Sequence, residues 1–463
     1  MKVRTVPYNQ KHQSSYNPST SIKNQKMRKY YQAALALTAA VSLVALLFYR
    51  HEYNKLRFVL QVFNYFGTPQ KNSLNCTNNI QVTNTYHQAA STSWQRLSED
   101  FYIYSAYSYD EGEIKAIGFG KHSSSNNYYC RVLFDDQLEY VQGKFLVQKI
   151  DENRQDLNND DLINNDDDQE YSGYLFTCKY EKLPDKDVVG MQVVDDKLKN
   201  YDSIPIIQVQ TLYNNFNSNK TGTIICVAPP ESKPLKHIDM ISFLAFHDYV
   251  GWDNFIVYDY GIPFVFNEAV RKMSLFSNVQ WNFTYSAVPW NFPYAQISRR
   301  VIRNLIEADC LYRTFSRASF AVTLAWDEYV NLKYHTSVEH VLSDLNKVNG
   351  KIDDKFRLNA VVFCTDYADS DSVNSPTPVI LRTTRRLRNV DKDEPLFIYK
   401  RDHISSNDIT QQEMDELMII NRYKKCNTND RRQIVNGVLR FAESMPSTQI
   451  FQYYITGRLF SHN

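Results

Sequence analysis

Two adjacent acids, Asp327 and Glu328, follow an apolar run in the segment SFAVTLAWDEYV (319–330). A carboxylate at the end of a strand in a parallel sheet can meet both solvent and a bound ligand. It can then hold a hard divalent cation, which in turn neutralises a diphosphate. The alternative is that the two acids simply cap a strand in solvent, and the pair alone does not decide between these interpretations.

Charged residues upstream of this pair could complete such a site. A helix is expected over about 295–308, because its apolar residues recur at helical spacing. Arg299 and Arg303 lie four residues apart on another face of this helix, where they either contact a phosphate-bearing donor or form a solvated basic face. Asp309, just past the helix, either caps it or contacts the same donor. Glu328 is the nearest candidate for a general base.

Two further side chains have an ordinary packing interpretation beside a chemical one. His247 lies within an apolar helical pattern, and Trp290 lies within the loop sequence VPWNFPY. The histidine could serve catalysis and the tryptophan could stack on a sugar ring. Both patterns favour packed residues instead.

The elements that would position these residues begin near Gly222. The run TIICVAPP predicts a short strand, LKHIDMISFLAFHDYVGW predicts a helix with Gly251 at its C-terminal cap, and NFIVYDYG predicts a second strand ending at Asp259. Strand, helix and strand at this spacing predict a βαβ unit and therefore a parallel sheet. Ligands of such sheets bind beyond the carboxyl ends of the strands, which places the loop 229–232 and Asp259 at the functional edge.

The composition before this region is different. Short runs rich in aromatic and β-branched residues, separated by polar turns, predict a small β-rich module over 91–220. Within it, 151–170 is dense in acids and poor in apolar residues, so we expect a disordered loop there. Residues 50–90 are rich in Asn and Thr and are predicted to be a stem.

An uncharged apolar stretch occupies 31–49. As a helix it would span roughly 28 Å, close to the hydrocarbon thickness of a bilayer. Lys and Arg residues cluster just before it, between 23 and 29, which predicts a cytosolic tail over 1–30 and a lumenal remainder. A cleaved signal peptide is the alternative, but the exit LLFYR lacks the small residues that cleavage needs. The sequence therefore predicts a single-pass type II membrane protein.

Cysteine usage and charge agree with a lumenal protein that does not bind nucleic acid. The chain has 7 Cys, all beyond the predicted anchor and none in a Cys-x-x-Cys pair, so at most three disulfides are expected, with open connectivity. Glycosylation sequons begin at Asn75, Asn219 and Asn282. With 52 basic and 51 acidic residues, the formal net charge of +1 argues against nucleic-acid binding that is driven by net positive charge.

The stretch from about Thr223 to Tyr423 resembles glycosyltransferase family 92. The segments that carry the resemblance are IICVAPP, FLAFHDYVGWDNFIVYDYG, EADCLYRTFSRASF, LAWDEYV and INRYKKC, together with the upstream SWQRLSEDFYIYSAYSYDEGEIKAIGF. The resemblance implies an α/β, GT-A-like domain over 221–450 with a Rossmann-type, mostly parallel sheet. It also implies a type II Golgi membrane protein that uses a manganese ion and transfers galactose, with inversion, from UDP-galactose to a glycan acceptor on a glycoprotein or glycolipid.

The sequence departs from the family pattern at two positions. The family motif Asp-x-Asp-Glu supplies metal-binding carboxylates, and Ala325 replaces its first Asp, leaving Asp327 as the matching metal ligand. A late His-Tyr pair reads Arg422-Tyr423, and Arg422 could pair directly with the donor diphosphate. Three states stay open: a transferase that binds metal weakly, a metal-independent transferase that uses arginine, or an inactive member that binds a nucleotide-sugar, a glycan or a partner in the Golgi lumen.

Overall fold

The structure is a computed structural model of the chain, which falls into two compact units, Met1–Thr83 and Asn84–Asn463. In the first unit it describes residues 35, 37, 38, 41 and 42. In the second unit it describes the segments 94–97, 101–110, 112–121, 128–135, 140–150, 171–181, 183, 186–195, 204–211, 222–229, 235–275, 283–293, 297–315, 318–348, 355–366, 378–400, 411–413, 417–426, 432–435 and 444–460.

Several predicted features fall on other parts of the chain. The expected cytosolic tail (1–30), stem (50–90) and acidic loop (151–170) lie outside the described residues, as does most of the expected anchor (31–49). Within the described segments, no helix combines the length and the apolar character that spanning a bilayer requires.

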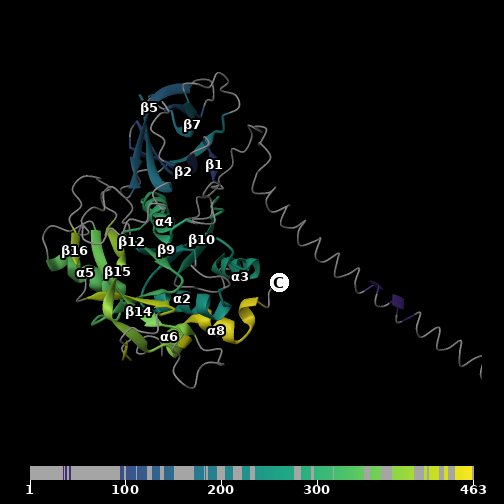
Figure 1. The fold of residues 1–463 in the computed structure, drawn as a ribbon, viewed down its shortest axis with the longest axis vertical. Helices are drawn as coiled ribbons and strands as arrows, with labels where there is room; N and C mark the ends of the chain where they lie inside the picture. Colours follow the sequence, from purple (N-terminus) through teal and green to yellow (C-terminus); the bar gives the residue numbers. More distant parts are fainter. Residues whose placement is uncertain are drawn as a thin grey trace, which may run out of the picture. The chain divides into compact units, whose positions relative to one another are not determined.

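Seven strands close into a β-barrel (Figure 1). All neighbouring barrel strands pair antiparallel except β8 and β2, whose parallel pairing closes the circle. The short β1 (Gln95–Arg96) pairs with β2 outside the circle. In spatial order the barrel strands are β2 (Phe101–Asp110), β3 (Glu113–Lys121), β6 (Tyr171–Lys179), β5 (Tyr140–Lys149), β4 (Tyr128–Phe134), β7 (Val188–Asp195) and β8 (Ile207–Thr211).

The barrel buries apolar side chains on both faces of its wall. Along β3, Ile114 and Ala116 belong to the core inside the barrel, whereas Ile117 and Phe119 pack outward against a second core. This alternation follows from the period of two of a β-strand. The outward residues of β2 and β3 therefore pack against the rest of the chain. Closure also leaves the barrel with no free edge.

The remaining strands form one mixed sheet (Figure 1). Four neighbouring strands, β11, β10, β9 and β12, run parallel, but β15 pairs antiparallel with both β12 and β14, and β13 pairs antiparallel with β17. The short strands β16 (Gln411–Glu413) and β18 (Arg432–Ile434) pair with β14 and β15. In spatial order the path is β11 (Thr284–Pro289), β10 (Asn254–Asp259), β9 (Thr223–Ala228), β12 (Phe320–Ala325), β15 (Arg385–Lys400), β14 (Lys355–Cys364), β17 (Met418–Lys424) and β13 (Glu328–Leu332).

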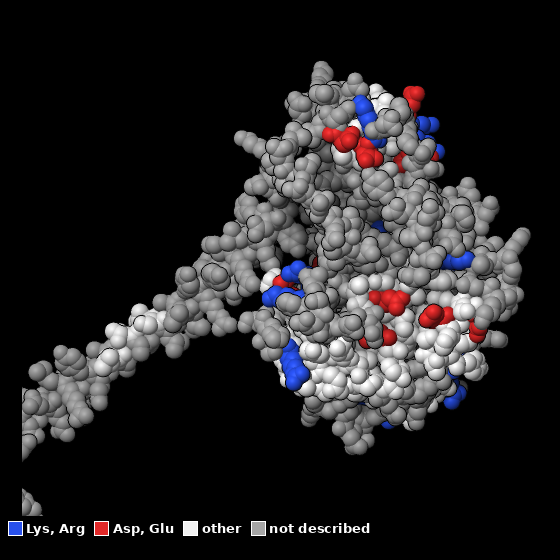
Figure 2. All heavy atoms as spheres, turned by 180° about the vertical axis from the view of Figure 1, so that it is seen from behind, with Lys and Arg blue, Asp and Glu red and all other residues white. Residues whose placement is uncertain are grey.

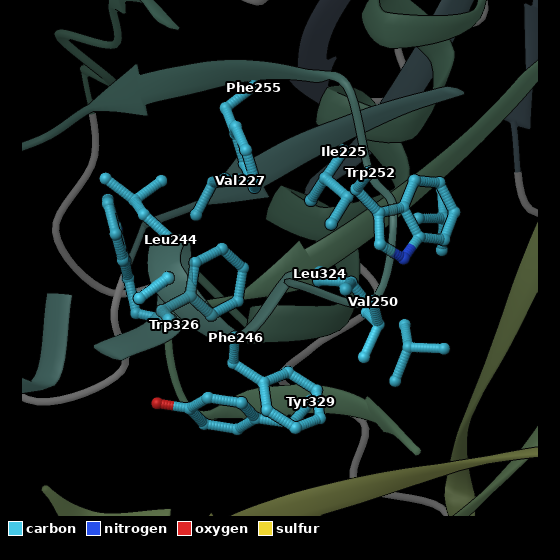
Figure 3. Packing of buried hydrophobic residues seen from close by; sticks show 14 of the residues in the cluster. Ile225, Val227, Leu244, Phe246, Val250, Trp252, Phe255, Leu324, Trp326 and Tyr329 are labelled. Carbon is cyan, nitrogen blue, oxygen red and sulfur yellow. The ribbon is translucent and has the colours of Figure 1, made fainter. Parts of the chain in front are cut away.

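Helices cover the two faces of this sheet unequally. One face packs against most of the helices in a core that includes Ile225 and Val227 (Figure 3). The other face, through Ile224 and Cys226, packs against α4 and the outer wall of the barrel. The helical elements are α2 (His237–Tyr249), α3 (Phe264–Leu275), α4 (Arg299–Arg313), α5 (Val338–Val348), α6 (Val379–Arg382), η4 (Met445–Ser447), α8 (Gln449–Ile455) and η5 (Arg458–Phe460).

The predicted α/β, GT-A-like fold with a Rossmann-type, mostly parallel sheet is wrong. The described part of the chain is mostly β, with a closed seven-strand barrel and a mixed sheet. The local βαβ unit of β9, α2 and β10 is present, with β9 and β10 parallel. The generalisation from that unit failed because β13, β15 and β17 bring antiparallel pairs into the same sheet.

Three disulfides join the described elements. They are Cys130–Cys178 inside the barrel, Cys226–Cys310 between β9 and α4, and Cys364–Cys426 beside the end of β14. The first bridge crosses β5 at Gly143, where a Cβ atom would come within 2.8 Å of the Cys130 sulfur and 2.6 Å of a backbone oxygen. Only glycine therefore fits at that point of β5.

A buried carboxylate joins the barrel to the mixed sheet. Asp309 in α4 accepts hydrogen bonds from the hydroxyls of Ser105 (2.5 Å) and Tyr107 (2.6 Å) of the barrel and of Tyr258 (2.5 Å) of β10. The Arg313 guanidinium donates to it as well, at 2.8 Å through Nε. Because Asp309 is fully buried, these donors replace the water that the charge has lost.

Replacing Asp309 with Asn should destabilise the protein. The substitution leaves the buried Arg313 charge without its counter-ion, a change that typically costs about 3 to 5 kcal/mol. Denaturant unfolding of the full-length chain measures the loss. As a control, Glu268→Gln removes the partly exposed ion pair with Arg271 and should change stability by less than about 1 kcal/mol; equal effects of the two substitutions would contradict the role given to Asp309.

Candidate functional site

The acids Asp327 and Glu328 lie at a corner between two strands. β12 ends at Ala325, Trp326 and Asp327 form a turn, and β13 begins at Glu328. Here β13 pairs antiparallel with β17, which places Arg422 directly opposite Glu328. The backbone N–H of Tyr423 donates to the Asp327 carbonyl at 2.8 Å. The structure thus brings the late Arg-Tyr pair to the acids that are nearly a hundred residues earlier.

Glu328 is fully buried and surrounded by cations. Its Oε1 accepts from Arg303 Nη2 at 2.9 Å and from Arg422 Nε at 2.8 Å, and Arg299 Nη2 lies 3.5 Å away. Its Oε2 accepts from the backbone N–H of Ala325 at 2.7 Å. Burial alone would raise the pKa of Glu328, but the three guanidiniums outweigh burial and hold it well below the ordinary range. Glu328 is therefore a permanent anion with occupied oxygens, which makes it unsuited to act as a general base.

A second carboxylate extends this ion network away from the corner. Asp391 in β15 accepts from Arg422 Nη1 at 2.8 Å and from Lys424 Nζ at 3.0 Å. Burial opposes ionisation of Asp391, but these cations outweigh it and lower its pKa. Arg422 is 1% exposed and bonded to two carboxylates, so its guanidinium faces the protein interior and not a ligand.

Asp327 has different surroundings from its neighbour. Its side chain is 26% exposed, and Arg299 Nη2 lies 3.6 Å from Oδ1. Among the residues that the structure describes, none donates a hydrogen bond to that Oδ1. Burial raises the pKa of Asp327, Arg299 opposes the rise, and the negative charge of Glu328 adds to it. Oδ1 is itself buried, so a ligand would reach this carboxylate through the exposed part of the side chain. A partly exposed carboxylate with a raised pKa can accept a proton from a ligand.

Arg299 is the more exposed of the two α4 arginines at this corner. It is the first residue of α4, and the Ser298 side chain caps the helix by accepting from the Val301 N–H. The positive end of the helix dipole therefore lies at the same corner as the guanidinium. The Arg299 side chain is 20% exposed, whereas Arg303, one turn further along, is 3% exposed and bonded to Glu328.

The other predicted residues lie elsewhere. Asp259 at the end of β10 accepts from the Ile262 N–H and from Asn267 Nδ2, so it shapes the turn into α3. Asp309 lies in the buried barrel contact, ten residues and roughly 15 Å along α4 from Arg299. Trp290 is 1% exposed and packs among aromatic rings of the barrel and sheet.

His247 is a core residue. It is fully buried, its Nδ1 is 2.8 Å from the Phe243 carbonyl, and its Nε2 accepts from the Val330 N–H at 3.3 Å. Burial lowers its pKa to about 3, so the ring is neutral and donates through Nδ1. The histidine thus ties α2 to β13, just behind the corner.

The side chains at the corner do not fit a manganese site. A Mn²⁺ ion needs several oxygen ligands, but Ala325 offers a methyl group, both Glu328 oxygens accept from other donors, and a guanidinium faces Asp327. Among the described segments, no three His, Cys, Asp or Glu side chains lie together as a metal site. The donor set at this corner suits an anion that contacts Arg299 better than a cation.

Comparison with known proteins gives no family for the chain. No family model matches it, and no curated protein matches it. The resemblance to glycosyltransferase family 92 therefore stays a prediction. On the face drawn in Figure 2, described basic and acidic side chains lie interspersed, without a broad surface of one sign among them.

Sequence reasoning did not find several residues at the corner. Asp391 and Lys424 complete the ion network, and Tyr329 and Tyr423, the residues next to Glu328 and Arg422, lie in the apolar core. The sequence could have indicated Tyr423, because it adjoins Arg422 in the late Arg-Tyr pair. Nothing in the sequence indicated Asp391, because the highly charged stretch around it did not predict a strand.

Removing the charge of Glu328 should destabilise the protein much more than removing the charge of Asp327. Glu328→Gln leaves three guanidiniums around a neutral group, so we expect a loss of stability of about 3 to 5 kcal/mol. Asp327→Asn, the matched substitution one residue away, removes only a partly exposed ion contact with Arg299 and should change stability by less than about 1 kcal/mol. Thermal unfolding of the full-length chain compares them; a larger loss for Asp327→Asn would contradict the assignment.

The buried neutral His247 predicts a pH-dependent stability term. Its folded pKa of about 3 lies below the ordinary unfolded value of about 6.5. The unfolded chain therefore binds more protons between these values, and the contribution is fully present above pH 6.5 and lost as the pH falls toward 3. From pH 7.5 to pH 5 the loss should be about 2 kcal/mol.

The neighbouring Asp248 requires a difference measurement. Burial raises its pKa to about 6, so it acts with the opposite sign in the same pH range. Subtracting the unfolding free energy of His247→Gln from that of the wild-type chain at each pH cancels the Asp248 contribution. This difference should fall by about 2 kcal/mol on acidification from pH 7.5 to pH 5. A difference that is constant with pH would show that His247 is not a neutral core residue.

Proposed function

We propose that the chain is a membrane-anchored hexosyltransferase of the Golgi lumen that transfers galactose from UDP-galactose to a glycan acceptor with inversion. The observation that carries this proposal is the pairing of a partly exposed carboxylate, Asp327, with a partly exposed guanidinium, Arg299, at a strand end and a helix N-terminus. One side chain can take a proton, and the other can neutralise a leaving diphosphate. The resemblance of the surrounding segments to glycosyltransferase family 92 supports the same reaction.

The reaction assigns one role to each side chain. Asp327 accepts the proton of an acceptor hydroxyl as that oxygen attacks the anomeric carbon of the donor. The bond between the anomeric carbon and the phosphate oxygen breaks, and the nucleoside diphosphate leaves with the bonding electrons. Its added negative charge develops toward Arg299 and the N-terminus of α4. Attack from the side opposite the leaving group inverts the configuration.

The buried ions at the corner hold these two groups in position. Glu328 binds Arg303 and the backbone of Ala325, so α4 and the end of β12 are fixed relative to each other. Arg299 and Asp327 are attached to those same elements. A transfer reaction depends on such positioning, because a reacting group misplaced by about 1 Å can lose a hundredfold in rate. Glu328 and Arg422 are thus positioning residues in this proposal, and Arg299 supplies the charge that a metal ion supplies elsewhere.

One observation favours a second candidate function. Ala325 replaces an acid of the family motif, and Glu328 is occupied by cations, so Asp327 is left as the carboxylate for chemistry among the described residues of this corner. A protein that binds a nucleotide-sugar or glycan without turnover would retain Arg299 and have no need for Asp327. Turnover separates this candidate from the transferase.

The test uses the purified full-length chain with UDP-galactose and a set of galactose-accepting glycans, with and without a chelator. We expect transfer that persists in the chelator, because Arg299 and not a metal ion neutralises the diphosphate. Asp327→Asn should lower kcat about 100-fold or more, and Arg299→Ala should lower it about 100-fold. Activity should also fall in acid, at a pH above the ordinary aspartate pKa, as Asp327 becomes protonated.

Matched controls are available on the exposed surface. Asp344→Asn and Arg271→Ala change residues of the same types that are 50% and 43% exposed and should leave kcat unchanged. UDP binding without any turnover would favour the binding protein. Transfer that the chelator abolishes would contradict the role of Arg299, and unchanged turnover in Asp327→Asn would remove Asp327 from the mechanism.

A further inference from the structure

Basic residues gather on the strands that border the Asp327 corner. The strand β15 opens with Arg385, Arg386 and Arg388, and Lys425 directly follows β17. The stretch 382–390 contains arginines and no acid. The mechanism proposed above uses none of these cations.

Strand register brings these cations to the level of the corner. Phe363 in β14 pairs with Arg386 of β15 on one side and with Tyr423 of β17 on the other. Since neighbouring strands are about 4.8 Å apart, the backbones of Arg386 and Tyr423 are two strand spacings, roughly 10 Å, apart. The Tyr423 N–H donates to the Asp327 carbonyl at 2.8 Å. The basic end of β15 therefore lies beside the candidate site and not at the far end of the sheet.

Three of these cations keep a positive charge that no described carboxylate neutralises. Arg388 and Lys425 are exposed, and neither makes an ion pair within the described part of the chain. Arg386 is half-buried, and the amide oxygen of Gln433, with the amide turned to suit, accepts from its Nη2 at 2.6 Å and its Nε at 2.7 Å. Because an amide is a neutral partner, the charge of Arg386 stays uncompensated.

Two carboxylates at this end of the strands are already engaged. Asp391 is 5% exposed and binds Arg422 and Lys424. Asp366, which follows β14, accepts from the Cys426 N–H at 2.9 Å. An anionic ligand could therefore meet the three cations without breaking an ion pair inside the protein.

The chemistry of this surface selects an anionic sugar. Guanidinium and ammonium groups bind carboxylate and sulfate through charge-assisted hydrogen bonds. The position of the surface favours a glycan over a membrane, because an acceptor whose hydroxyl reaches Asp327 has the strands β17, β14 and β15 directly beside it. An exposed surface also needs no cavity to admit an extended chain of sugars.

We propose that Arg386, Arg388 and Lys425 form a docking surface for the acceptor, and that the acceptor is an anionic glycan carrying carboxylate or sulfate groups. The hydroxyl that reacts lies at Asp327, and the anionic groups further along the same glycan contact the cations of β15 and the end of β17. The inference rests on the proposed transferase for the role of this glycan as the acceptor. Its binding needs no turnover.

The test compares oligosaccharides of equal length and different charge. The full-length chain is titrated by calorimetry with a hyaluronan tetrasaccharide, which carries carboxylates, a chondroitin sulfate tetrasaccharide, which carries sulfates as well, and neutral chitotetraose. We expect at least one anionic tetrasaccharide to bind about tenfold more tightly than chitotetraose, and this preference should shrink as salt is added. A preference for both anionic probes identifies the carboxylate as sufficient, and a preference for the sulfated probe alone identifies the sulfate.

Substitutions of the two exposed cations locate the surface. Arg388→Gln should weaken binding of the anionic tetrasaccharide about fivefold, and adding Lys425→Gln should weaken it about fivefold more. Because both side chains are exposed and unpaired within the described residues, neither change should alter the thermal midpoint of the unliganded chain. Arg271→Gln, at a 43% exposed arginine on α3, is the matched control and should leave the affinity unchanged.

Four results would overturn the surface. They are equal affinity for the neutral and anionic tetrasaccharides, unchanged affinity in the double variant, an equal loss of affinity for UDP in that variant, which would assign the cations to the donor, and a loss confined to binding of phosphatidylserine vesicles, which would assign them to a membrane.

The two proposals fail separately. If the full-length chain shows no transfer but the glutamine variants bind the anionic tetrasaccharide more weakly, the surface stands as a glycan-binding surface and the transferase does not. If transfer occurs and the double variant binds and uses every glycan as the wild type does, the transferase stands and this surface does not.

Discussion

The carboxylate of Glu328 holds the corner of the structure together. It binds guanidiniums from α4 and β17 and the backbone of β12, and so joins the consecutive elements α4 and β12 to a strand that comes much later in the sequence. Inside the protein such a charge is tolerated only when its partners are complete. Because the partners are complete, the exposed members of the corner, Arg299 and Asp327, are held in fixed positions where solvent reaches them.

The same reasoning applies to the other end of α4. There Asp309 accepts hydrogen bonds from the barrel and from β10, and the Cys226–Cys310 bridge joins the helix to β9. A helix fixed at both ends by buried charges cannot slide along the sheet. The barrel therefore contributes to the candidate site at a distance, because its hydroxyls help to set the position of the helix that carries Arg299.

Local patterns predicted some elements well, and pairings between distant segments were the main failure. The strand and helix signals of β9, α2 and β10 were clear because each is an uninterrupted apolar run, and the apolar run of β12 gave the position of the acids. β15 was missed because its first part is rich in Arg and Asp and is stabilised by ion pairs such as Arg422–Asp391, and its buried apolar residues, among them Leu396 and Ile398, come only near its end. The closure of the barrel rests on the parallel β2–β8 pairing, which no local pattern reports.

The disulfide inside the barrel has a consequence for how the chain can assemble. Cys130 and Cys178 belong to β4 and β6, which are not neighbours, since β5 lies between them. The bridge passes over β5 at Gly143, so this strand runs beneath a covalent strap that joins the strands on either side. The bridge closes a loop of the chain that contains β5 itself, so wherever the thiols are oxidised β4 and β6 cannot move apart even when the chain unfolds, and the loop that carries β5 has fewer conformations to lose when the barrel forms.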